Sequence, residues 1–212
     1  MERDFELIRK IMVDDQLKTR KIQSEPILEA MRNVPRHLFV PENLRCYSYD
    51  DSPLPIGLGQ TISQPYIVAY MTELLEPVSG MKILEIGAGS GYQAAILAYL
   101  GCKVYSIELV EDLAKKAQEN LAALHFDNIQ IRCGNGYLGW PEEAPFDAIV
   151  VTAAPDRIPD KLIAQLNEGG KMIIPVGETY SVQILKLIIK KDGMIIEKEL
   201  LPVRFVPMVE SS

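Results

Sequence analysis

The stretch Glu85-Ile86-Gly87-Ala88-Gly89-Ser90-Gly91 decides the fold, because it joins an apolar strand pattern to a helix pattern. Glycines at such a junction let a ligand approach the backbone, and the N–H groups that open the helix face an anion. The nicotinamide fingerprint Gly-x-Gly-x-x-Gly is not met, because the third glycine, Gly91, comes one residue early and Tyr92 follows it. The loop therefore disfavours an adenine dinucleotide, and only a looser variant of that site stays open.

The chain after this loop alternates between strand and helix patterns, which predicts a parallel sheet with helices on both faces. Strand patterns lie at residues 81–86, 103–108, 129–133, 146–152 and 171–176, with helix patterns at 92–100, 113–124 and 159–166. Two last strand patterns, 182–190 and 194–201, flank Lys191-Asp192-Gly193, whose Asp-Gly pair is typical of a hairpin turn. We expect an α/β fold with a mostly parallel sheet of about seven strands that ends in an antiparallel hairpin.

The sequence before the loop has a different character. Apolar residues recur at helical spacing through residues 1–50, which predicts an N-terminal helical extension. Prolines and glycines alternate with apolar residues over 53–59, which favours an ordered loop over a flexible linker. Ser63 is expected to cap a helix that carries Pro65 in its first turn.

Composition excludes several classes of protein. The 22 Lys and Arg residues against 29 Asp and Glu give a net charge of −7, so neither nucleic acid nor an anionic membrane is an expected partner. The densest basic stretch, residues 186–191, is interleaved with apolar residues and is expected to be a solvated sheet edge. Cys46, Cys102 and Cys133 are far apart and lack nearby histidines, which indicates buried thiols and no metal site.

The ends of the chain and its hydropathy bear on location. No apolar run approaches the roughly 18 residues that span a bilayer. The start, Met1-Glu2-Arg3-Asp4-Phe5, lacks the basic and apolar parts of a secretory signal, so we expect a cytoplasmic protein. We also expect a monomer.

A carboxylate at the end of the second strand pattern adds to the glycine loop. Glu108 lies 21 positions after Gly87, where an acid can accept hydrogen bonds from both ribose hydroxyls of a nucleoside. Taken together, Glu108, the acid Glu85 just before the glycines and the Gly-x-Gly-x-Gly spacing make this chain resemble one class of enzymes. These are the Rossmann-like, class I methyltransferases that use S-adenosyl-L-methionine. Gly134-Asn135-Gly136 falls where that class places a polar residue, usually aspartate, beside adenine. The amide oxygen of Asn135 can still accept a hydrogen bond there, although Asn-Gly also favours a simple turn.

That resemblance implies a cofactor, S-adenosyl-L-methionine, and a set of residues that hold it. The implied cofactor-binding residues are Glu85, Gly87, Ala88, Gly89, Gly91, Glu108, Asn135 and Gly136.

Three further stretches point to one family within the class. Residues 57–66 read Gly-Leu-Gly-Gln-Thr-Ile-Ser-Gln-Pro-Tyr, residues 146–155 read Phe-Asp-Ala-Ile-Val-Val-Thr-Ala-Ala-Pro, and residues 203–208 read Val-Arg-Phe-Val-Pro-Met. Together with the glycine loop they closely resemble the protein-L-isoaspartate (D-aspartate) O-methyltransferase family. The resemblance implies methylation of the carboxyl group of L-isoaspartyl residues, and less efficiently of D-aspartyl residues, in damaged proteins and peptides. The methyl ester then closes to a succinimide, whose hydrolysis returns some normal aspartate.

The same resemblance implies an organisation and a set of roles. We expect a single domain over 1–212, with the helical extension and a substrate-side loop over 1–62 and the Rossmann-like core over 63–212. Ser63 takes the catalytic role, as a hydrogen-bond donor that positions the carboxylate. The implied substrate-binding residues are Thr61, Ile62, Tyr66, Ala154 and Val206.

The expected chemistry suits neutral donors. An isoaspartyl α-carboxyl with a pKa of about 3.5 is already ionised at neutral pH, so no general base is needed. Positive and negative charge cancel as the methyl group moves, so a strong cation beside the carboxylate would stabilise the ground state more than the transition state.

Other interpretations stay open. A methyltransferase of the same fold could act on another carboxyl or on a small-molecule hydroxyl, and methylation of an isoaspartyl peptide would separate the two. A non-catalytic adenosine-binding or interaction protein that has kept the glycine loop and, third, a nicotinamide oxidoreductase are more distant. Residues 152–155 read Thr-Ala-Ala-Pro and therefore lack the polar-Pro-Pro-aromatic motif of amino-methylating nucleic-acid enzymes. The sequence thus disfavours that class of methyltransferase.

Overall fold

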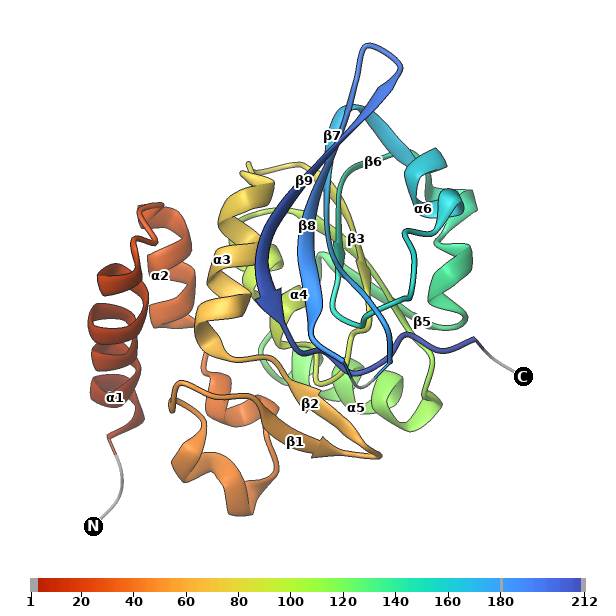
Figure 1. Ribbon diagram of the computed structural model, residues 1–212. Helices are drawn as coiled ribbons and strands as arrows, with labels where there is room; N and C mark the ends of the chain where they lie inside the picture. Colours follow the sequence, from red (N-terminus) through yellow and green to blue (C-terminus); the bar gives the residue numbers. More distant parts are fainter. Residues whose placement is uncertain (1–3, 180, 211–212) are drawn as a thin grey trace.

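In the residues that the computed structural model describes, 4–179 and 181–210, a twisted seven-stranded sheet forms the centre of the protein (Figure 1). Its strand order is β5-β4-β3-β6-β7-β8-β9, and helices cover both of its faces. Residues 1–3, which entered the argument against a secretory signal, lie outside the described residues. None of the described helices is long and apolar enough to cross a membrane.

The sheet confirms the predicted mixture of parallel and antiparallel strands. The strands are β3 (Lys82–Ile86), β4 (Lys103–Glu108), β5 (Ile129–Cys133), β6 (Phe146–Val151), β7 (Leu166–Val176), β8 (Gln183–Lys191) and β9 (Met194–Val203). Strands β3 to β7 pair in parallel, whereas β8 and β9 are antiparallel. The turn between β8 and β9 has positive φ at both Asp192 (53°) and Gly193 (71°), as the Asp-Gly pair predicts.

The helices and short strands complete the chain. The helices are α1 (Phe5–Met12), α2 (Glu25–Asn33), α3 (Pro65–Leu75), α4 (Tyr92–Tyr99), α5 (Glu111–Ala123) and α6 (Asp160–Ala164). A π-helical turn spans Val13–Leu17, and 3-10 turns span Lys18–Arg20, Arg36–Phe39, Glu42–Tyr47, Gly136–Leu138 and Pro141–Glu143. A separate hairpin of β1 (Leu54–Gly57) and β2 (Gln60–Ile62) lies below the main sheet in Figure 1.

Two apolar cores lie on the two faces of the sheet, because successive side chains of a strand point to opposite faces. Ile83 belongs to the core that includes α2, α3 and α4, whereas its neighbour Leu84 belongs to the core beneath α6. The first of these cores continues without a break into the N-terminal extension, through residues such as Met12 and Met31.

Three expectations from the sequence were wrong about local structure. Ser63 does not cap α3, because the residue before that helix is Gln64, which makes no capping hydrogen bond with its side chain. The loop expected at 53–59 is the start of the β1–β2 hairpin. The helix expected at 159–166 is shorter, and β7 begins at Leu166 with an irregularity near Gly169, whose φ is +80°.

Two surface expectations were also wrong. The basic stretch is not a sheet edge, because β8 lies between β7 and β9, and Lys186 forms ion pairs with Glu197 and Glu199 across the hairpin. Of the cysteines, Cys102 is buried as expected, but Cys133 at the end of β5 is exposed.

Candidate active site

A narrow cleft opens at the carboxyl ends of β3, β4 and β6, where open α/β sheets bind their ligands. Its walls come from the glycine loop, the end of β4, the β1–β2 hairpin and the segment after β9. The lining residues are Gln60, Thr61, Ile86, Gly87, Gly89, Ile107, Glu108, Leu109, Val110, Gly136, Thr152, Ala153, Val206, Pro207, Met208 and Val209.

Glu108 organises the centre of this cleft. One of its carboxylate oxygens accepts a hydrogen bond from the Gly89 N–H (2.8 Å), and the other accepts from the Val110 N–H (3.0 Å). The residue is only 6% exposed, yet it lines the cleft. Each carboxylate oxygen can accept more than one hydrogen bond, so Glu108 can hold the loop and still accept from a ligand.

Gly87 is required by its surroundings as well as by its backbone. Its φ is +94°, and a Cβ there would lie 2.4 Å from the hydroxyl oxygen of Thr152. That hydroxyl donates to the carbonyl oxygen of Gly87 (2.7 Å) and so ties the end of β6 to the glycine loop. Sequence reasoning gave Thr152 no role, although a polar residue directly after a buried apolar strand was the available signal.

Gly91 serves packing and does not line this cleft. It precedes α4 with a φ of +90°, and a Cβ there would lie 3.2 Å from side-chain atoms of Leu121 in α5. Ala88, in contrast, is buried and lines a small space on the far side of the loop, together with Gly87 and Ser63. Gly91 is not among the residues that line the cleft, so its contact with a cofactor stays a prediction.

Glu85 lies behind the glycine loop and not in the cleft. Its side chain is fully buried, and one carboxylate oxygen accepts a hydrogen bond from the Ser106 hydroxyl. Burial raises the pKa of Glu85 to about 8, although the Ser106 hydrogen bond opposes that rise. The other oxygen has no hydrogen-bond partner among the described residues. Glu85 thus supports the loop from behind, and its burial favours the protonated form of the carboxyl.

The two predicted cofactor residues in the turn after β5, Asn135 and Gly136, lie in different places. Gly136 lines the cleft, and a Cβ there would lie 2.4 Å from Ile86, so only glycine fits. Asn135 turns its side-chain oxygen toward the Tyr137 N–H (2.9 Å) and lines a different cavity with Asp156. Asn135 thus caps the 3-10 turn Gly136–Leu138, but its φ of −78° is not the positive φ that an Asn-Gly turn favours, and its contact with adenine stays a prediction.

A second, larger cavity lies outside the cleft. It measures about 410 Å³ and is lined by Pro53, Thr61, Ser63, Gln64, Ile67, Val182, Pro202, Val203, Arg204 and Phe205. Thr61 lines both this cavity and the cleft. Ser63 lines the cavity and also a small space shared with Gly87, Gly89 and Thr152, so it stands between the outer cavity and the glycine loop.

The structure separates the other predicted substrate residues. Ile62 lines the small space beside Ser63, and Val206 lines the cleft. Ala154 is buried and acts through its backbone, since its N–H donates to the Val206 carbonyl and its carbonyl accepts from the Met208 N–H, both at 2.8 Å. Ala154 thus fixes the segment that walls the cleft without lining it.

Tyr66 is the predicted substrate residue that lies furthest from its expected place. Its ring stacks on Tyr70 with the centroids 5.7 Å apart, and the Arg20 guanidinium lies 5.0 Å from the Tyr66 centroid. It is not among the residues that line the cleft or the outer cavity. The expected pocket wall is therefore a contact between α3 and the N-terminal extension.

Comparisons with known proteins agree with this arrangement. The family model described as protein-L-isoaspartate(D-aspartate) O-methyltransferase matches residues 8–212. A protein-L-isoaspartate O-methyltransferase of Opitutus terrae is 56% identical over 199 residues, which cover 94% of this chain and 85% of the relative. One of Gloeobacter violaceus is 52% identical over 197 residues, covering 93% and 96%.

Solved structures give the same result. A protein-L-isoaspartate O-methyltransferase superposes with a TM-score of 0.84 at 32% identity, covering 96% of this chain and 65% of that one. A Plasmodium falciparum beta-aspartate methyltransferase in complex with S-adenosyl-L-homocysteine superposes with a TM-score of 0.83 at 32% identity, covering 96% and 99%. The chain therefore belongs to the protein-L-isoaspartate (D-aspartate) O-methyltransferase family, whose enzymes depend on S-adenosyl-L-methionine.

Proposed function

We propose that this chain methylates the carboxyl group of L-isoaspartyl residues, and less efficiently of D-aspartyl residues, in damaged proteins. The reaction starts repair, because the ester closes to a succinimide whose hydrolysis returns some normal aspartate. One observation carries the assignment of sites: Thr61 lines both the cleft at the glycine loop and the outer cavity, so the two spaces meet at the segment that holds Ser63.

The cleft fits the chemistry of S-adenosyl-L-methionine. The Glu108 carboxylate can accept hydrogen bonds from ribose hydroxyls, and Ile107, Leu109 and Met208 offer apolar contacts to an adenine ring. The cofactor, when bound, supplies a methyl group that is already activated for transfer. The cleft as it stands measures only about 80 Å³. The cleft shares Thr61 with the outer cavity of about 410 Å³ and with the small space at Ser63, so a bound ligand can extend beyond the cleft itself.

The outer cavity accommodates the damaged residue. Its carboxylate is ionised at neutral pH, so the chain needs to bind and orient it and does not need to remove a proton. The hydroxyls of Ser63 and Thr61 are neutral donors at the junction of the two spaces, and neutral donors leave the carboxylate nucleophilic. The apolar walls formed by Ile67, Val203 and Phe205 limit the access of water.

A paired-peptide assay tests this function. Two synthetic peptides that differ only in isoaspartate or aspartate at one position are incubated with the protein and S-adenosyl-L-methionine labelled in its methyl group. We expect base-labile label on the isoaspartyl peptide alone. Label on neither peptide, with cofactor binding intact by calorimetry, would favour a methyltransferase of the same fold with another acceptor. The absence of binding as well would favour the non-catalytic alternative.

The Ser63→Ala variant tests the role given to Ser63. Hydrogen bonds to charged groups contribute about 1.5–3 kcal/mol, so kcat/KM for the isoaspartyl peptide should fall by roughly ten- to a hundredfold. The Kd for S-adenosyl-L-homocysteine should change much less. Ser79→Ala, at an exposed serine before β3, is the matched control. Activity equal to the parent protein in Ser63→Ala would remove Ser63 from the site.

The proposal extends to the organisation of the chain. A single methyltransferase domain over 1–212 is supported by the apolar core that runs from the N-terminal extension into the sheet. A cytoplasmic location is supported by the exposed thiol of Cys133, which suits a reducing compartment. A monomer that does not bind nucleic acid is supported by the net charge of −7 and is tested by light scattering and by a binding assay with duplex DNA.

A further inference from the structure

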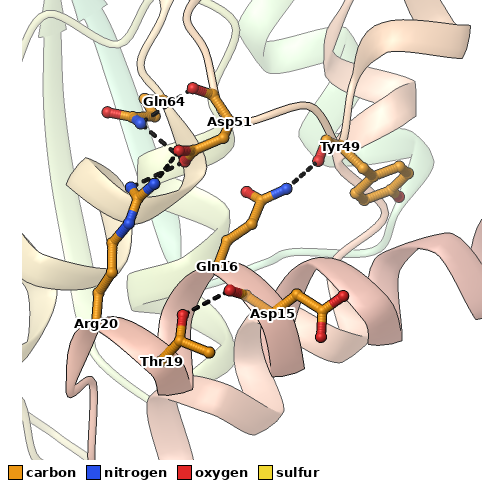
Figure 2. Close-up of polar contacts among 7 residues, drawn as sticks. All are labelled: Asp15, Gln16, Thr19, Arg20, Tyr49, Asp51 and Gln64. Carbon is orange, nitrogen blue, oxygen red and sulfur yellow. Dashed lines mark hydrogen bonds and ion pairs between the residues drawn. The ribbon is translucent and has the colours of Figure 1, made fainter.

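The carboxylate of Asp51 links the N-terminal extension to the residue that follows Ser63 (Figure 2). The Gln64 side chain donates to an Asp51 carboxylate oxygen (2.8 Å) and to the Asp51 backbone carbonyl (3.1 Å). The same carboxylate accepts two hydrogen bonds from the Arg20 guanidinium, one of them at 3.1 Å to the oxygen that Gln64 also reaches. Asp51 therefore bonds at once to Arg20 and to Gln64, which are far apart in the sequence.

The segment that carries Arg20 is itself fixed to α3. The Glu73 carboxylate in α3 accepts hydrogen bonds from the backbone N–H groups of Gln23 and Ser24, both at 2.7 Å. The Arg20 guanidinium also lies over the ring of Tyr66 in the first turn of α3. Arg20 thus reaches Asp51 from a backbone that α3 holds in place.

Gln64 transmits this arrangement to the site. It stands directly before α3 with an extended backbone (φ −49°, ψ 138°), and its side chain bonds to Asp51 and not to the start of the helix. The same residue lines the outer cavity next to Ser63. The direction in which the chain leaves β2 and enters α3 is therefore set by a side-chain contact with Asp51.

We propose that Asp51, held by Arg20, is a positioning residue that sets the Thr61–Gln64 segment for the methyl acceptor. The proposal rests on the function proposed above, because it concerns the carboxylate that Ser63 and Thr61 hold. A small misplacement of positioning groups has large kinetic effects, so the acceptor should bind and align less well once Asp51 is lost. Of this segment only Thr61 lines the cleft, and neither Glu108 nor the glycine loop bonds to Asp51, so cofactor binding should change much less than acceptor binding.

The test compares Asp51→Ala, Asp51→Asn and Arg20→Ala in the full chain. We expect Asp51→Ala to raise KM for an isoaspartyl peptide on the order of tenfold, with a smaller fall in kcat and a nearly unchanged Kd for S-adenosyl-L-homocysteine. Asp51→Asn keeps an oxygen that can accept from Gln64 but loses the ion pair with Arg20. Its KM should therefore lie between those of the parent protein and Asp51→Ala. Arg32→Ala breaks an ion pair with Glu25 elsewhere in the extension and should match the parent protein.

The outcomes separate this inference from the proposed function. A merely structural role for Asp51 would lower kcat through loss of folded protein and leave KM unchanged, and that result would overturn the inference. An equal loss of cofactor affinity would overturn it too. If Asp51→Ala does not fold, Arg20→Ala decides alone, because Arg20 lies at the surface. If the parent protein fails to methylate the isoaspartyl peptide at all, the proposed function itself is wrong.

Discussion

Replacing Glu85 by glutamine should change how stability depends on pH. Folding raises the pKa of Glu85 from 4.5 to about 8, chiefly because the carboxyl is fully buried behind the glycine loop. Between these two values the folded protein keeps a proton that the unfolded chain has released. The unfolded state therefore binds fewer protons, and the free energy of unfolding falls as pH rises through this window.

The magnitude follows from the two pKa values. One pKa unit corresponds to about 1.4 kcal/mol, so between about pH 5.5 and 7.5 this one residue should remove about 2–3 kcal/mol of stability. Glu85→Gln lacks the titration. Its amide also rearranges hydrogen bonds with Ser106, but that offset does not depend on pH. The stability of the variant relative to the parent protein should thus rise by about 2–3 kcal/mol across the window.

Urea unfolding of both proteins at several pH values, without cofactor, measures this difference. Taking the difference cancels every other titrating group, and equal m-values show that the unfolded states are comparable. Ser106→Ala removes the hydrogen bond that lowers the pKa of Glu85, so in that variant the loss should continue to higher pH. Parallel stability curves for the parent protein and Glu85→Gln would refute a buried neutral acid at this position.

Three further predictions follow from local geometry. Gly87→Ala should lose about 1–3 kcal/mol more than Gly80→Ala, because both have positive φ but only the first places a Cβ against Thr152; equal losses in thermal unfolding would contradict the clash. Glu108→Gln should weaken binding of S-adenosyl-L-homocysteine by roughly tenfold or more, as hydrogen bonds to charged acceptors contribute about 1.5–3 kcal/mol, and an unchanged calorimetric Kd would count against the ribose contact. Folding lowers the pKa of His37 from 6.5 to about 4, mainly through burial, so the unfolded state binds more protons in that window and stability is lost as pH falls below 6.5. His37→Gln should lose less stability than the parent protein between pH 7 and pH 5, and identical losses would rule this linkage out.

The sheet could be predicted because each strand carries its own local signal. The bounds expected at 103–108 and 129–133 agree with β4 and β5, and the hairpin turn at Asp192 follows from one dipeptide. These features depend on alternation, burial and turn chemistry within a few residues, which a single sequence displays directly.

Pro65 lies in the first turn of α3 as expected, but the residue that precedes this helix could not be predicted in the same way. Ser63 satisfies the local rule for a helix cap. It directly follows β2, however, and the next residue, Gln64, bonds to Asp51 and precedes the helix. Asp51 is also bonded to Arg20, 31 residues away. Partners at this separation leave no periodic trace in one sequence.

The candidate site shows the same limit at the level of side-chain direction. Glu108, Gly87 and Gly136, which the motifs place at or just after the carboxyl ends of neighbouring strands, line one cleft. A motif does not show where each side chain points. The sequence therefore could not predict that Glu85 lies behind the loop or that Tyr66 lies against Arg20.

The two hydrogen bonds of Glu108 restrict any attempt to redesign this enzyme for a different nucleoside. The carboxylate that we propose for the ribose is also the acceptor that holds the amides of Gly89 and Val110. Exchanging it to suit a modified ribose would release both amides and let the loop change shape. A workable redesign must therefore provide new acceptors for these two N–H groups before it alters the ligand contact.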